Sequence, residues 1–268
     1  MNVSLGSSAA RSARQRLAPL LWMLKFGEEL SRDIALGQAG LAPTPQLQRV
    51  LGLQSRQEAM HAALFGAALR CCCAPGRAAA PPRLIAALDD FSARLRDDVA
   101  AGRLAASMIG LQCVLEGLAG AVLRPAQGEL ARLGDRLLPL RSFVLLQEEA
   151  HHRLGEVWLP RLTGRDAASA AAALAATCRG YVASGDAIVE AGLVLFDGYA
   201  ADRDHYAAAS RVHLDAVRSW ATTLSRAGTT PIAFTAASAG GRLPASSGGS
   251  ARLEPGACEI EAASHGGD

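Results

Sequence analysis

Aromatic residues are scarce in this chain of 268 residues, at 4% of the sequence. Together with abundant alanine, this scarcity disfavours a β-sandwich or barrel, because their strands are rich in aromatic and β-branched residues. Neither sign of charge dominates, since 27 Lys and Arg oppose 25 Asp and Glu. The resulting net charge of +2 gives no basic footprint for nucleic acid. We therefore expect an all-α protein that does not bind nucleic acid.

The chain also lacks paired cysteines and long hydrophobic runs. Its six cysteines include the contiguous set 71–73 but no C-x-x-C pair, so we expect free thiols in a reducing compartment. The apolar run 17–26 is ten residues long and contains Lys25, whereas a membrane span needs roughly 20 apolar residues. These features predict a soluble, cytoplasmic protein with no membrane span.

Apolar residues recur at helical spacing along most of the chain. A break near Gly102 divides one unusually long helical pattern, and Gly, Ser and Pro accumulate after residue 227. We expect a flexible N-terminal tail at 1–16, a helical domain at 17–227 and a disordered C-terminal tail at 228–268. The individual helices are predicted at about 17–39, 46–73, 83–123, 127–162, 166–184 and 186–226.

Histidine is scarce, yet it recurs three residues after glutamate. Chance would produce about 0.3 Glu-x-x-His spacings in this composition, but three occur: Glu58/His61, Glu148/His151 and Glu149/His152. Residues at i and i+3 lie on one face of an α-helix, so the carboxylate and the imidazole can converge on one ion. The spacing therefore indicates a metal site.

Each Glu-x-x-His helix follows a helix that carries another carboxylate in an apolar stretch. Glu28 lies 30 positions before Glu58, and Glu116 lies 32 positions before Glu148. Glu116 is the only charged residue of 104–123. Because an unpaired buried carboxylate is costly, it needs a partner such as a metal ion. The chain is thus interpreted as a duplicated helical pair.

Helical phase separates two overlapping candidates in the fourth helix. Glu148 and His151 share a face with Val144, whereas Glu149 and His152 lie on the neighbouring face, which carries more charge. We therefore favour Glu148 and His151.

The same reasoning applies to the first helix. Glu28 is in phase with Leu17 and Leu24, whereas Glu29 is in phase with Lys25, so Glu28 is preferred. Four carboxylates and two histidines from four helices form the ligand set of ferritin-like di-iron and di-manganese proteins. The candidate ligands are Glu28, Glu58, His61, Glu116, Glu148 and His151.

Four segments resemble the metal-bearing helices of the ferritin-like di-iron oxidase and oxygenase superfamily: FGEELSRDIALG, SRQEAMHAALFG, IGLQCVLEGLAGAV and FVLLQEEAHHRLGEVWL. The last two are especially similar to the bacterial aldehyde-deformylating oxygenases. Arg32 and Ala35 stand where those enzymes have tyrosines, and Val144 stands where N-oxygenases of the superfamily have a further histidine. The resemblance implies a ferritin-like bundle with additional C-terminal helices, in which the six candidates are ligands and Glu58 and Glu148 bridge the ions.

Such a centre suits two iron ions, with Fe/Mn or Mn/Mn as alternatives, because carboxylate-rich ligation favours these metals. We expect an O2-dependent oxidase or oxygenase that takes electrons from an external donor and oxidises a small or lipophilic molecule, such as a fatty aldehyde. Its pocket is predicted at Leu24, Phe65, Ile109 and Val144. A monomer or dimer is expected. The alternatives are iron storage and a helical scaffold with a vestigial metal site.

Overall fold

Helices make up nearly all of the residues that the computed structural model describes, which are 4–71, 80–123, 138–162 and 167–226. Within these ranges there is no strand, so the predicted all-α class is confirmed. All of the described helices belong to one compact unit. In chain order the elements are α1 (Ser4–Leu41), α2 (Pro45–Cys71), α4 (Pro82–Ala100), α5 (Leu104–Met108), the π-helix η1 (Ile109–Leu115), α6 (Glu116–Leu123), α8 (Leu138–Leu162), α9 (Ala167–Gly192), the 3₁₀ turn η3 (Leu193–Phe196) and α10 (Ala200–Arg226).

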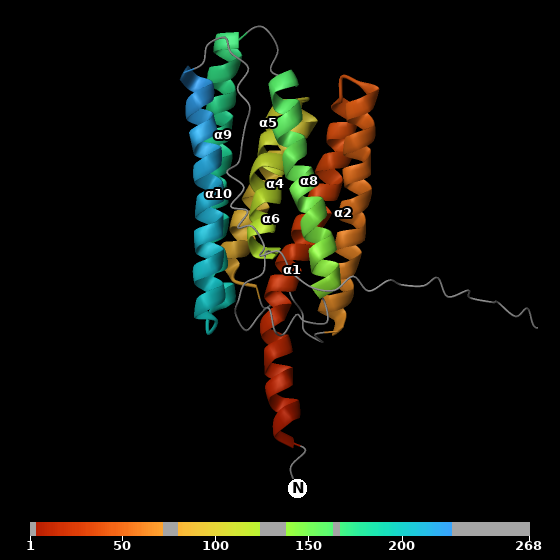
Figure 1. Cartoon of the computed structure of the whole chain (residues 1–268), viewed down its shortest axis with the longest axis vertical. Coiled ribbons are helices and arrows are strands. Elements are labelled where there is room, and N and C mark those ends of the chain that lie inside the picture. Colours follow the sequence, from red (N-terminus) through yellow and green to blue (C-terminus); the bar gives the residue numbers. More distant parts are fainter. Residues whose placement is uncertain (1–3, 72–79, 124–137, 163–166, 227–268) are drawn as a thin grey trace, which may run out of the picture. The chain divides into compact units, whose positions relative to one another are not determined.

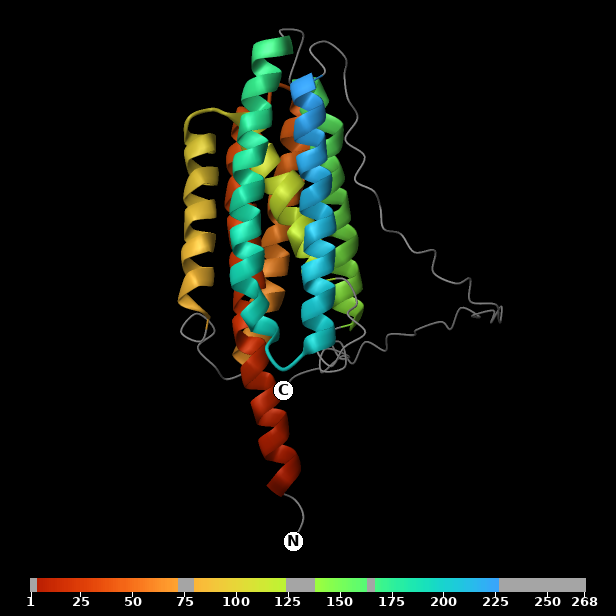
Figure 2. The same ribbon diagram turned by 90° about the vertical axis from the view of Figure 1, so that its left-hand side faces the viewer.

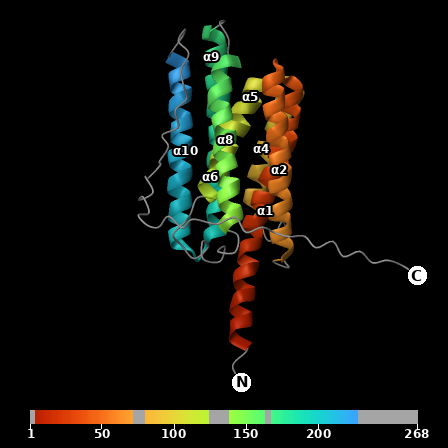
Figure 3. The same ribbon diagram turned by 45° about the vertical axis from the view of Figure 1, so that its right-hand side comes forward.

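The long helices run side by side as a bundle (Figure 1). Helices α1 and α2 pack together on one side, and α9 and α10 pack together on the other. Figure 2 shows the second pair joined through η3. Between the two pairs lie α4, α8 and the consecutive segments α5, η1 and α6, an order that the turned view of Figure 3 also shows.

The central segment Leu104–Leu123 is long and apolar enough to cross a membrane by length and composition. However, 78% of its most apolar window is buried inside the bundle, as expected for the core helix of a helical protein. Among the described residues it is the only helix that passes this test. The described residues therefore contain no clear membrane span.

Local signals set several helix ends. Thr44 Oγ1 accepts a hydrogen bond from the Leu47 amide at 3.2 Å, and Pro45 occupies the first position of α2, where its missing N–H is not needed. Gly102 has φ of +71° and separates α4 from α5, as the sequence predicted. Gly198, with φ of +86°, lies in the turn before α10.

Two predicted boundaries are wrong. Helix α1 begins at Ser4, so most of the predicted tail 1–16 is helical; its Ala, Arg, Gln and Leu favour helix without an apolar stripe. The predicted break at residue 185 lies inside α9, where a Cβ on Gly185 would approach Leu214 Cδ2 to 3.0 Å and Val114 Cγ1 to 3.1 Å. This glycine therefore permits close packing rather than ending a helix. The predicted C-terminal tail, 228–268, lies outside the described residues.

Candidate metal centre

The structure brings all six candidate ligands together in the bundle interior. Glu28 comes from α1, Glu58 and His61 from α2, Glu116 from the start of α6, and Glu148 and His151 from α8. Every one of the six residues is at most 4% exposed. Four helices thus contribute ionisable groups to a region from which water is largely excluded.

The competing candidates lie elsewhere. The Glu29 side chain is 42% exposed and pairs with Lys25 Nζ at 2.6 Å. Glu149 is exposed on α8, and His152 Nδ1 donates to the Gln112 carbonyl oxygen at 2.8 Å. Helical phase therefore selected the buried carboxylate or imidazole from each overlapping pair.

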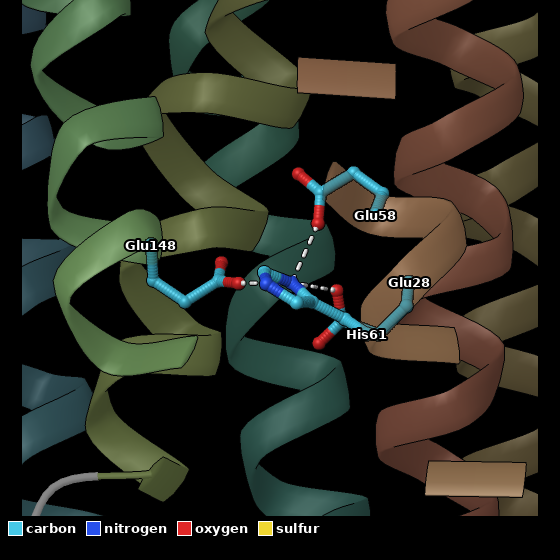
Figure 4. Close-up of side chains that lie close together, drawn as sticks. All are labelled: Glu28, Glu58, His61 and Glu148. Atoms are coloured by element: carbon cyan, nitrogen blue, oxygen red, sulfur yellow. Dashed lines mark hydrogen bonds and ion pairs between the residues drawn. The ribbon is translucent and has the colours of Figure 1, made fainter. Parts of the chain in front are cut away.

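Three carboxylates crowd one ring nitrogen of His61 (Figure 4). His61 Nδ1 lies 3.2 Å from Glu28 Oε2, 3.1 Å from Glu58 Oε2 and 3.2 Å from Glu148 Oε1. This nitrogen carries at most one hydrogen and cannot donate to three oxygens at once. Donor atoms held about 2.1 Å from one cation lie roughly 3 Å from one another. The spacing is therefore the one expected around a bound cation.

A second group adjoins the first. One ligand atom from each of Glu58, Glu116 and His151 lies within 4.8 Å of the others, so Glu58 belongs to both groups. His151 Nδ1 is 2.8 Å from Glu58 Oε1. Although charged groups lie within 3.2 Å of Glu148 Oε1 and His151 Nδ1, these atoms and Glu148 Oε2 are buried and make no hydrogen bond of regular geometry in the described part of the chain. Buried polar atoms normally have partners, so these three atoms fit a metal ion.

The electrostatics of the metal-free site reflect its burial. Desolvation raises the pKa of Glu28 and Glu116 well above the usual range and that of Glu148 to about 7. Burial alone would raise the pKa of Glu58 as well, but the adjacent His151 and His61 imidazoles lower it. His61 has a pKa raised to about 12 despite its burial, because the adjacent carboxylates of Glu148, Glu28 and Glu58 stabilise its charged form.

Buried glutamines extend the site, and the sequence analysis missed them. Gln54 Nε2 donates to Glu58 Oε1 at 3.2 Å and to Glu116 Oε1 at 2.9 Å. Its own oxygen accepts from Gln112 Nε2 at 3.0 Å, and Gln112 also donates to Gln38 at 2.8 Å. Gln54 lies four residues before Glu58, so its helical phase was the available signal. This network fixes the positions of the Glu58 carboxylate in α2 and the Glu116 carboxylate in α6 relative to each other.

The π-helix η1 ends immediately before Glu116, and two histidines bond to its carbonyl oxygens. His152 of α8 donates to the Gln112 oxygen, and His213 Nε2 of α10 donates to the Cys113 oxygen at 2.8 Å. A π-helix disturbs the regular α-helical ladder and is often found at functional sites. The two histidines thus support the turn that presents Glu116 to the other ligands.

A cavity of about 50 Å³ lies beside Glu28, Glu116 and Glu148. Of the four predicted pocket residues, only Leu24 lines it. Phe65 and Val144 instead pack in a small apolar cluster with Leu24. This cavity therefore does not include Phe65 or Val144, and their place in a substrate pocket stays a prediction.

Ile109 also lies outside this cavity lining and is fully buried in the main hydrophobic core. On an α-helix, residues seven apart such as Ile109 and Glu116 lie on the same face. The π-helix that begins at Ile109 has a wider turn, so these two residues do not share a face here. The cavity lining is Met23, Leu24, Gly27, Glu28, Ser31, Leu88, Leu115, Glu116, Leu118, Ala119, Val122, Glu148, Ile188 and Tyr206.

Comparison of the chain with models of known protein families gave no match, and comparison with curated protein sequences gave none either.

Proposed function

We propose that this protein is a ferritin-like di-iron oxidase or oxygenase that uses O2 to oxidise a small or lipophilic organic substrate. The observation that carries the proposal is the buried convergence of two Glu-x-x-His pairs and two further carboxylates from four helices. Carboxylate-rich ligation with one imidazole for each cation suits iron or manganese better than zinc or copper. Iron is the proposed metal, with Fe/Mn and Mn/Mn as the alternatives.

The two groups assign the ligands. Glu28, Glu58, His61 and Glu148 would hold one ion, while Glu58, Glu116 and His151 would hold the other. Two divalent cations would balance the negative charge of the four carboxylates, while the two histidines are neutral ligands. The balance removes the free-energy cost of burying unpaired carboxylates. When bound, ferrous ions supply electrons and open coordination positions for O2.

The residues around the ligands keep the site dry and ordered. Gln54 fixes one oxygen of Glu58 and one of Glu116, and it is itself 1% exposed. Leu115, Leu118 and the other apolar residues of η1 and α6 exclude water on the same side. Low solvent access strengthens the electrostatic interactions inside and limits side reactions.

The cavity beside the carboxylates indicates the kind of substrate. No Lys, Arg or His is among the described residues that line it, and Ser31 and Tyr206 are the only polar residues there besides the three glutamates. The lining itself therefore offers no side-chain cation to an anionic group, which only the proposed metal ions could attract. Because a water needs at least about 10–15 Å³ of such space, the cavity of about 50 Å³ admits only a few heavy atoms. A small neutral molecule, or the uncharged end of a longer one, fits best.

The proposal includes an external electron donor, a cytoplasmic location and a monomeric or dimeric state. It is tested by anaerobic reconstitution with ferrous iron, removal of loose metal and elemental analysis. We expect about two irons per chain, and we expect Glu116→Ala to lose both. Glu29→Ala, which removes the exposed neighbour of Glu28, is the matched control and should retain them.

Function is then measured as O2 uptake with a reductant and a panel of small neutral substrates, and assembly by gel filtration. Substrate-dependent O2 consumption by a monomer or dimer supports the enzyme. A large hollow assembly that accumulates iron would instead indicate storage, and a wild-type protein that retains no metal would contradict the di-iron centre.

A further inference from the structure

The two metal-site histidines are held by glutamines in a reciprocal arrangement. His61 Nε2 in α2 lies 2.6 Å from Gln147 Oε1 in α8. His151 Nε2 in α8 lies 2.9 Å from Gln57 Oε1 in α2. Each glutamine therefore reaches across to the histidine of the other helix.

The sequence contains this arrangement twice. Gln57 directly precedes Glu58 in the segment QEAMH, and Gln147 directly precedes Glu148 in the segment QEEAH. The repeated unit is Gln-Glu-x-x-His rather than Glu-x-x-His. Residues i and i+4 share a helix face, so each glutamine lies beside its own histidine but bonds to the other one.

The hydrogen-bonding roles follow from the chemistry of the amide. A carboxamide oxygen accepts hydrogen bonds and cannot donate, so Nε2 of each histidine carries the proton in these contacts. In the neutral imidazole, Nδ1 is then the unprotonated nitrogen. Nδ1 is also the nitrogen that faces the carboxylates, at 3.1 Å from Glu58 for His61 and at 2.8 Å from Glu58 for His151.

We propose that Gln57 and Gln147 are positioning residues that fix both histidines as Nδ1 ligands of the cations without adding a negative charge to the site. This inference rests on the proposed metal centre. Metal-bound histidines generally donate their second ring N–H to an acceptor that fixes the tautomer and raises ligand basicity. A carboxylate acceptor would draw the ring proton and favour the higher oxidation state of the metal. An amide acceptor orients the ring without that added negative charge.

The test uses the full chain loaded with Co(II), whose binding is measured by absorption and needs neither O2 nor substrate. Gln57→Leu and Gln147→Leu remove the acceptors, and each should weaken Co(II) binding about 10–100-fold. Gln57→Glu and Gln147→Glu keep an acceptor and should restore affinity. Gln48→Leu, on the exposed face of α2, is the matched control and should bind as the wild type does.

A spectroscopic readout separates positioning from general damage. In water, each cation-bound histidine with a protected Nε2–H should give one exchangeable, paramagnetically shifted proton signal in the Co(II) protein. Each Leu variant should lose one of these signals and keep the other, and the two variants should lose different ones. In the iron-loaded protein, the Glu variants should lower the midpoint potential, because the added charge stabilises ferric iron.

Two results would overturn the inference: Leu variants that keep both signals and wild-type affinity, or Glu variants whose midpoint potential equals that of the wild type. Circular dichroism of the metal-free variants establishes that they fold. If a Leu variant does not fold, the isosteric Glu variants supply the test. A wild-type protein that binds no cation contradicts the proposed function itself. The two failures are therefore distinguishable.

Discussion

Replacing Glu116 by glutamine should stabilise the metal-free protein and abolish metal binding. The Glu116 carboxyl is buried at the start of α6, and desolvation raises its pKa well above the ordinary value of 4.5. A glutamine in the same position retains an oxygen that can accept the hydrogen bond from Gln54 Nε2. Its amide nitrogen can donate to Glu148, whose oxygens make no hydrogen bond of regular geometry among the described residues. The substitution thus replaces a carboxyl that must take up a proton on burial with a side chain that is always neutral and can make the same contacts.

The magnitude follows from linkage. In the unfolded chain Glu116 ionises near pH 4.5, so folding at pH 7 either buries the charge or takes up a proton. Proton uptake across this interval costs at most about 3.4 kcal/mol, at about 1.36 kcal/mol per pH unit. We therefore expect Glu116→Gln to stabilise the metal-free protein by about 1–3 kcal/mol at pH 7, which corresponds to about 2–4 °C in melting temperature per kcal/mol. Because the folded-state pKa is raised, this gain should vanish below pH 4.5, where both states are protonated.

Thermal unfolding with a chelator and with excess Co(II) measures both effects. At a free metal concentration 100-fold above Kd, each occupied site stabilises the wild type by about 2.7 kcal/mol, so the order of the two proteins should invert when metal is added. Glu29→Gln, at an exposed carboxylate in α1, should leave both measurements unchanged. A less stable metal-free Glu116→Gln protein, or one with wild-type metal content, would refute the reasoning.

Three further predictions concern the same centre. Metal affinity should rise with pH through about 7, the pKa of Glu148, because protons compete for that ligand; Co(II) titrations at a series of pH values measure this. Gly117→Ala should weaken Co(II) binding, since its Cβ would lie 2.0 Å from His213 Cε1 beside the Glu116 turn. Gly120→Ala, with no atom within 4 Å of the new Cβ, is its control. Metal removal should increase amide hydrogen exchange in α8 more than in α9, and equal increases would contradict a localised effect.

The sequence was sufficient to place the buried carboxylates and imidazoles because phase and burial are linked in a helix. Glu28 and Glu148 lie among apolar residues at helical spacing, whereas Glu29 and Glu149 fall on charged faces. The choice between neighbours required no knowledge of how the helices cross. It required only that one face of each helix be buried.

The cavity and the glutamines depended on information that periodicity does not contain. Which residues line the cavity is set by helix crossing and by the wider turn of η1, which moved Ile109 away from the position that a regular helix would give it. Gln54 and Gln112 resemble solvated helix residues in sequence, yet both are buried because they pair with each other and with the site. A polar residue is buried only where its partners are available, and those partners come from other helices.

Helix α8 packs far less against α2 than α1 does. Helices α1 and α2 pack extensively against each other, whereas α8 packs mainly on α6 and η1 and makes few contacts with α2. The contacts that do join α2 to α8 include Glu58 with His151, His61 with Glu148, and the two glutamine–histidine pairs. If the proposed cations bind, they would join the groups of α2 and α8 directly. We therefore expect metal binding and the docking of α8 to be linked.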